Sequence, residues 1–72
     1  MGKPRDVTMQ SLVRDVRIRK NITQEELAEA VGVTRQTIIA IEKGNYTPSV
    51  ALALALSHFF NKKVEDLFLY EH

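Results

Sequence analysis

The stretch TQEELAEAVGVTRQTIIAIE, residues 23–42, has the pattern of two short helices joined by a glycine. Leu27 and Val31 lie four residues apart on one face of the first helix, and Ile38 and Ile41 lie three apart on one face of the second. A glycine at the junction tolerates the left-handed backbone that ends a helix and turns the chain at once. The stretch therefore predicts two helices that pack at a corner.

Residues at the helix ends support this prediction. Thr23 is followed by Glu26 three positions later, which predicts a capping box at the start of the first helix. Thr34 can cap the second helix in the same way. Gly32 is placed to end the first helix, and Ala28 is the small residue where the two backbones approach.

The other face of the second helix presents long polar side chains around one small residue. Arginine and glutamine recognise guanine and adenine through paired hydrogen bonds in the major groove, which is wide enough for a helix. An ordinary solvated helix face has a similar composition, so the prediction depends on the whole corner and not on single residues. The predicted base contacts are Thr34, Arg35, Gln36, Ile39 and Ala40.

This stretch resembles the helix-turn-helix of the phage-repressor-like family, known as the Cro/repressor or XRE type. The residues that carry the resemblance are Gln24, Leu27, Ala28, Gly32, Ile38 and Ile41. The similarity continues through GNYTPS and VEDLF and covers roughly residues 12–69, so it is more specific than a short motif. It implies an all-α, five-helix, lambda-repressor-like DNA-binding domain in which helices two and three form the helix-turn-helix.

The resemblance also implies roles for individual residues. Arg17 in the first helix and Glu42 at the end of the recognition helix match a structural ion pair of the family. The start of the second helix and the loop after the third are placed to hold DNA phosphates. Tyr46 in that loop can equally pack on its neighbours. The predicted phosphate contacts are Thr23, Gln24, Lys43, Asn45, Tyr46 and Thr47.

Composition limits the classes of protein that fit. Seventy-two residues make one domain, which buries only about 60% of its unfolded surface and gains from a partner subunit. Without cysteine there is no disulfide framework or thiolate zinc site, which fits the cytoplasm. We expect no cofactor, no metal, no membrane span and no enzymatic activity, because the sequence has no cysteine nucleophile, no clustered metal ligands, no glycine-rich phosphate loop and no apolar run long enough to cross a bilayer.

The net charge of +1 is distributed unevenly along the chain. Residues 1–20 hold six basic and two acidic side chains, a net charge of +4, whereas residues 21–30 hold three glutamates, a net charge of −3. A polarised charge of this kind can form a positive footprint for double-stranded DNA. A solvated surface of mixed charge remains the alternative.

Outside the central stretch, the chain divides into an N-terminal arm, a domain and a tail. Residues 1–10 predict a flexible arm, residues 11–69 the DNA-binding domain, and residues 70–72 the tail. The first helix is expected from Ser11 to Lys20, with Val13 and Val16 inward and Asn21 as a left-handed cap. The fourth begins at Pro48 or Ser49, and a short last helix spans Val64 to Leu69.

The fourth helix, VALALALSHFF, is apolar nearly all round. Its core stripe is expected at Val50, Leu52 or Ala53, Leu56 and Phe60. Apolar residues on its other side predict a homodimer interface, although exposed alanines are also good helix formers. The predicted interface residues are Ala51, Ala55, Phe59, Leu69 and Tyr70.

The functional prediction is a sequence-specific transcriptional regulator, a homodimeric repressor reading a palindromic operator through the major groove. The alternative is an antitoxin-like module that uses the fourth helix to bind a partner protein as well as DNA.

Overall fold

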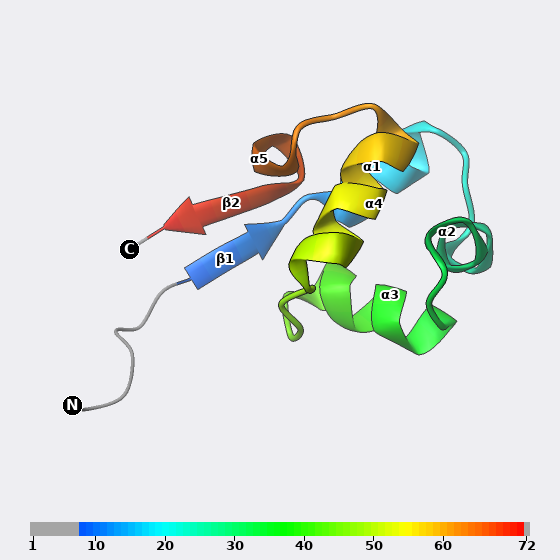
Figure 1. Cartoon of the computed structure of the whole chain (residues 1–72), viewed down its shortest axis with the longest axis horizontal. Helices are drawn as coiled ribbons and strands as arrows, with labels where there is room; N and C mark the ends of the chain where they lie inside the picture. Colours follow the sequence, from blue (N-terminus) through cyan, green and yellow to red (C-terminus); the bar gives the residue numbers. More distant parts are fainter. Residues whose placement is uncertain (1–7, 72) are drawn as a thin grey trace.

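The computed structural model describes residues 8–71, and these residues form five helices and two short strands (Figure 1). In chain order the elements are β1 (Thr8–Ser11), α1 (Val13–Arg19), α2 (Gln24–Val31), α3 (Arg35–Lys43), α4 (Val50–Phe60), α5 (Val64–Leu67) and β2 (Phe68–Glu71). The five predicted helices are present. The small sheet is an addition that the all-α prediction did not contain.

The core lies where α1, α2, α3 and α4 meet, and α5 and β2 close one end of it. Leu27, Ile38 and Ile41 are fully buried, and Ala28 is 4% exposed, as the corner pattern predicted. Among the residues whose burial the structure describes, 9–70, the buried side chains are Val13, Val16, Leu27, Ala28, Ile38, Ile41, Leu52, Leu56, Phe60, Leu67 and Phe68.

The predicted caps are confirmed. The Thr23 hydroxyl accepts from the Glu26 amide at 3.0 Å, and the Glu26 carboxylate accepts from the Thr23 amide at 2.8 Å. The Thr34 hydroxyl accepts from the Thr37 amide at 3.3 Å. Gly32 ends α2 with φ of +79°, in the left-handed region where a Cβ is unfavourable. Asn21 has φ of +58°, as expected for a left-handed residue after α1.

The two strands correct the prediction for both ends of the domain. β1 and β2 pair antiparallel, with Met9 opposite Tyr70 and Ser11 opposite Phe68 (Figure 1). Residues 8–10 are therefore part of a sheet and not of a flexible arm, and Tyr70, the first residue of the predicted tail, lies in β2. The rest of the predicted arm, residues 1–7, and His72 lie outside the described residues.

The predicted last helix is also shorter than expected. α5 ends at Leu67, and Phe68 and Leu69 belong to β2. The Leu67 carbonyl accepts from the Leu12 amide at 2.8 Å, which joins the end of α5 to the start of α1. Aromatic residues in the run from Phe68 to Tyr70 favour a strand once a partner strand is available. The first helix is also affected by the sheet. α1 begins at Val13, two residues later than predicted, because Ser11 is the last residue of β1.

One core prediction on α4 is wrong. Val50 is 77% exposed, whereas Leu52, Leu56 and Phe60 are buried as predicted. Val50 is the first residue of α4, and the Ser49 side chain caps this end of the helix through the Leu52 amide at 3.1 Å. The inward stripe of α4 therefore starts at Leu52, the earlier of the two positions that the sequence left open.

Candidate nucleic-acid interface

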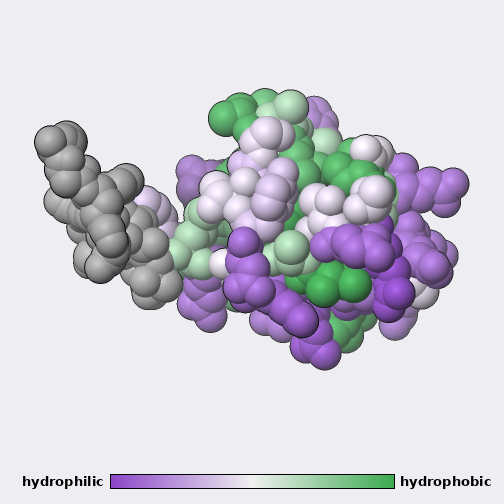
Figure 2. All heavy atoms as spheres, turned by 90° about the horizontal axis from the view of Figure 1, so that it is seen from below, coloured by the Kyte–Doolittle hydropathy of each residue, from purple (hydrophilic) through white to green (hydrophobic). Residues whose placement is uncertain are grey.

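The outer face of α3 is held at the surface by the burial of its inner face. Ile38 and Ile41 have no exposed area, which fixes the rotation of the helix about its axis. Thr34, Arg35 and Gln36 are exposed, and Ile39 and Ala40 are half-buried. Figure 2 views the molecule from the side on which α3 lies, and hydrophilic residues gather over much of that face. The structure thus brings all five predicted base-contact residues onto one short helix and its cap.

The predicted phosphate-contact residues flank this helix on two sides. Lys43, Asn45, Tyr46 and Thr47 are exposed in and beside the turn that follows α3, which begins at Gly44 with φ of +79°. The Asn45 amide donates to the Ala40 carbonyl at 3.0 Å, and this hydrogen bond ties the loop to α3. Thr23 and Gln24 lie at the start of α2. The Thr23 hydroxyl already serves as the helix cap.

The ion pair predicted between Arg17 and Glu42 is present. Nε of Arg17 donates to Oε2 of Glu42 at 2.6 Å, and Nη2 donates to Oε1 at 3.2 Å. Nη1 of Arg17 donates to the Ile22 carbonyl at 2.9 Å. The two side chains are 12% and 3% exposed. This bidentate pair therefore joins α1 to the end of α3 and also holds the turn before α2.

Gln24 has a role that the sequence did not predict. Its Nε2 donates to Oε1 of Glu42 at 3.1 Å, and its Oε1 accepts from Nε of Arg35 at 3.3 Å. Because the carboxylate can only accept, it orients the amide so that the carbonyl oxygen faces Arg35. A continuous chain of hydrogen bonds therefore runs from Arg17 through Glu42 and Gln24 to Arg35. The sequence pattern did not predict this chain of hydrogen bonds, because the residues that it joins lie 11 to 25 positions apart.

The predicted interface residues do not all lie on one surface. On α4, Ala51 is exposed, Ala55 is half-buried and Phe59 is 42% exposed. Leu69 and Tyr70 point to opposite faces of β2, because successive residues of a strand alternate. Phe59 also packs edge-on against Phe60, with 5.2 Å between ring centroids.

Two further apolar residues of α4 are at the surface and were missed. Val50 and Leu54 are 77% and 51% exposed and lie four residues apart, on one face of the helix. The sequence pattern could not separate them from the core stripe, because α4 is apolar on every side. They add to the exposed apolar residues of α4.

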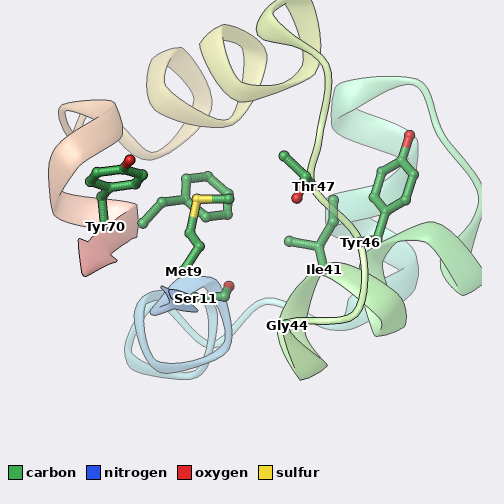
Figure 3. A pocket seen from close by; sticks show the side chains of 8 residues that line it. Met9, Ser11, Ile41, Gly44, Tyr46, Thr47 and Tyr70 are labelled. Carbon is green, nitrogen blue, oxygen red and sulfur yellow. The ribbon is translucent and has the colours of Figure 1, made fainter. Parts of the chain in front are cut away.

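A hollow of about 240 Å³ lies between the sheet and that loop (Figure 3). Its walls carry no charged side chain, and its lining residues are Met9, Ser11, Ile41, Gly44, Tyr46, Thr47, Phe68 and Tyr70. Met9 and Tyr70 face the hollow from the sheet, and Thr47 and Tyr46 border it from the loop. The sheet and the predicted phosphate loop are therefore neighbours in the fold.

Two negative findings apply to the part of the chain that the structure describes. Within residues 8–71, no group of three or more histidine, cysteine, aspartate or glutamate side chains is arranged to hold a metal ion. None of the helices in this range has the length and apolar character required to cross a membrane.

Comparison with known proteins identifies the class of protein that this fold and surface define. A helix-turn-helix family pattern matches residues 13–67. An uncharacterised HTH-type transcriptional regulator of Methanocaldococcus jannaschii is 52% identical over 63 residues, which is 88% of this chain and 96% of the relative. The chain belongs to this helix-turn-helix family, of the Cro/repressor or XRE type. It is a DNA-binding transcriptional regulator and not an enzyme.

Two other similarities are informative. The transcriptional repressor RstR of the cryptic phage CTXphi, from Vibrio cholerae, is 33% identical over 57 residues, which is 79% of this chain and 51% of RstR. This chain therefore corresponds to about half of RstR. The crystal structure of the transcriptional regulator VanUg superposes with a TM-score of 0.78 over 97% of this chain and 93% of VanUg, at 22% identity, and supports the fold.

Proposed function

We propose that this protein is a homodimeric, sequence-specific repressor that acts in the cytoplasm and reads a palindromic operator through the major groove. The observation that carries the proposal is the placement of Arg35 and Gln36. Both are exposed in the first turn of α3, a helix whose opposite face is fully buried. In helix-turn-helix proteins the N-terminal residues of the second helix are those that reach base edges.

The side chains of α3 suggest what is read. Arg35 suits a guanine, through O6 and N7, and Gln36 suits an adenine, through N6 and N7. Thr34 can contact either base, and Ile39 can pack on a thymine methyl. Ala40 is small and allows the helix to approach the groove closely. Each good bidentate contact contributes about 1–3 kcal/mol of discrimination against the wrong base.

Phosphate contacts would fix the position of α3 in the groove. Gln24 from the start of α2 and the residues of the loop after α3 lie on either side of the recognition helix. Contacts of this kind determine register and orientation but carry no sequence information directly. The contacts that we assign here are Thr23, Gln24, Lys43, Asn45, Tyr46 and Thr47.

A homodimer is supported by the apolar surface of α4. Val50, Leu54 and Phe59 are all more than one-third exposed, so the outer half of α4 presents apolar side chains to solvent. To bind successive major grooves, a two-fold dimer must hold its two recognition helices about 34 Å apart. Of the predicted interface residues, we retain Ala51, Ala55 and Phe59 as the centre. Leu69 and Tyr70 lie on opposite faces of β2, so at most one of them joins the same flat contact.

The same surface supports a second candidate, an antitoxin-like partner protein. Exposed valine and leucine on α4 would suit the binding of another polypeptide as well as that of a second copy. The assembly formed by the purified protein separates the two functions. A symmetric dimer that binds DNA without another protein supports the repressor. A monomer that associates only with a different protein supports the antitoxin-like function.

The repressor role is supported by the similarity to RstR, a named transcriptional repressor. The test compares affinity for the DNA upstream of the protein's own gene with affinity for a scrambled duplex, for the natural protein and for Arg35→Ala. We expect Arg35→Ala to lose roughly 1–3 kcal/mol mainly on the natural duplex. Equal binding of both duplexes by the natural protein would contradict sequence-specific repression.

A further inference from the structure

An open hollow of about 530 Å³ lies beside the start of α2. Side chains from α1, α2 and α3 surround it, namely Arg14, Arg17, Thr23, Gln24, Glu25 and Arg35. It adjoins the proposed base-contact surface, because Arg35 borders the hollow and begins the recognition helix. α1 has no part in the DNA contacts assigned so far, yet it contributes two of the three arginines.

Two of the three guanidinium groups of the hollow have partners within the described residues. Arg17 is matched by Glu42, and Arg35 donates to the Gln24 side chain. Arg14 is exposed, and it has no ion pair among residues 8–71. Glu25 is the one carboxylate among the lining residues, so it offsets only part of the charge of Arg14 and Arg35. The hollow therefore keeps an excess of positive charge that its own residues do not neutralise.

The backbone at the start of α2 adds to this potential. The capping box occupies the amides of Thr23 and Glu26. The amides of Gln24 and Glu25 are the other two in the first turn with no acceptor inside the helix. They carry the partial positive charge of the N-terminal end. A phosphate oxygen at this position would meet backbone donors from α2 and a guanidinium from α1.

The turn of α1 that carries Arg14 is anchored by its neighbours. Arg14 and Arg17 lie three residues apart and so share a face of α1. Arg17 is fixed by its three hydrogen bonds to Glu42 and Ile22, and Val13 and Val16 are buried on either side of Arg14 in the sequence. The backbone that carries Arg14 is therefore anchored to the core and to α3, and the Arg14 side chain itself must be ordered when DNA binds.

We propose that Arg14 is a further DNA-binding residue, which extends the interface onto α1 by contacting the phosphate held at the start of α2. This inference rests on the DNA-binding function proposed above and adds a contact outside the helix-turn-helix itself. Because the contact is to the backbone, it contributes equally to every DNA sequence. It is a strong contact, since a guanidinium can bind phosphate through two parallel hydrogen bonds.

The experiment measures the affinity of the full chain for the natural upstream duplex and a scrambled duplex across a salt series. Arg14→Ala is expected to weaken binding of both duplexes by about five- to tenfold at low salt. It should lower the slope of log K against log [salt] by about one, the loss of one phosphate contact. Arg14→Lys should keep the slope, because it keeps the charge. Arg19→Ala is the matched control, since Arg19 is exposed on α1 but borders a different hollow with Val16, Lys20 and Lys62.

Two results would overturn the inference. An unchanged slope for Arg14→Ala, in a variant with the natural thermal midpoint, would show that Arg14 does not meet phosphate. An equal loss in Arg14→Ala and Arg19→Ala would show that only net charge matters. Equal binding of the two duplexes by the natural protein would contradict sequence-specific repression, but the comparison of slopes would still decide the role of Arg14.

Discussion

Removal of the Glu42 carboxylate tests how the buried ion pair contributes to stability. In Glu42→Ala the guanidinium of Arg17, whose side chain is 12% exposed, keeps the Ile22 carbonyl and loses two hydrogen bonds to the carboxylate. A buried charge left without its partner costs about 3–5 kcal/mol. Because Arg17 keeps one acceptor and some exposure, we expect about 3 kcal/mol. At about 0.05–0.15 kcal/mol per residue, this is a large part of the total stability of a 72-residue chain.

The assay is urea unfolding followed by circular dichroism, repeated at several protein concentrations so that any dimer dissociation is separated from unfolding. The double variant Arg17→Met with Glu42→Leu is the informative control. Replacing both partners by apolar residues of similar size removes the unpaired charge, and such replacements are often neutral or stabilising. We therefore expect the double variant to be more stable than Glu42→Ala alone.

The reasoning would be refuted by either of two outcomes. A cost below about 1 kcal/mol for Glu42→Ala would mean that Arg17 reaches solvent and behaves as a surface charge. A double variant as unstable as Glu42→Ala would mean that packing at this site matters more than charge, and that the pair is not a source of buried electrostatic cost.

Three further predictions follow from single residues. Gln24→Ala should reduce the preference for the natural base opposite Arg35 more than it reduces affinity for scrambled DNA, because Arg35 loses its hydrogen bond to Oε1 of Gln24. Affinities for duplexes altered at that base measure the preference, and an unchanged preference would contradict the prediction. Gly32→Ala should cost about 1 kcal/mol in urea unfolding and Gly32→Asn less, because φ is +79° and a Cβ would meet nothing within 4 Å, so only the backbone conformation opposes it. Leu54→Asp should shift the protein from dimer to monomer in sedimentation equilibrium, because it places a charge on the exposed side of α4. Ala30→Ser, at an exposed position of α2, is the control and should leave the dimer intact. A dimer in both variants would exclude the α4 surface as the dimer interface.

Local patterns were sufficient to predict the two helices of the corner and their caps. The capping box at Thr23, the left-handed Gly32 and the spacing of Ile38 and Ile41 are all interactions within a few residues of the chain. Such interactions depend only on the backbone of one helix and its ends, so they can be predicted from the sequence without knowledge of the fold. The exposed position of Arg35 and Gln36 follows from the same pattern, because the buried face defines the outer one.

Other features needed information from distant parts of the chain. β1 and β2 each have four residues, and neither has a pattern that predicts a strand by itself. They form because the two ends of the domain meet, and only then do their backbone groups find partners. The surface position of Val50 and Leu54 has the same origin, since an all-apolar helix does not show which side its neighbours cover.

The sequence by itself determined the family, the two helices of the corner, their caps and the helix that presents Arg35 and Gln36, because these features depend on residues within a turn or two of one another. The Arg17–Glu42 pair was implied by the family pattern and not by local physics. Only the tertiary structure decided that Gln24 joins Glu42 to Arg35, that the ends of the domain pair as a sheet, and that Arg14 and Arg35 border one hollow. These contacts span 11 to about 60 residues of sequence, and their geometry is determined by how the helices pack.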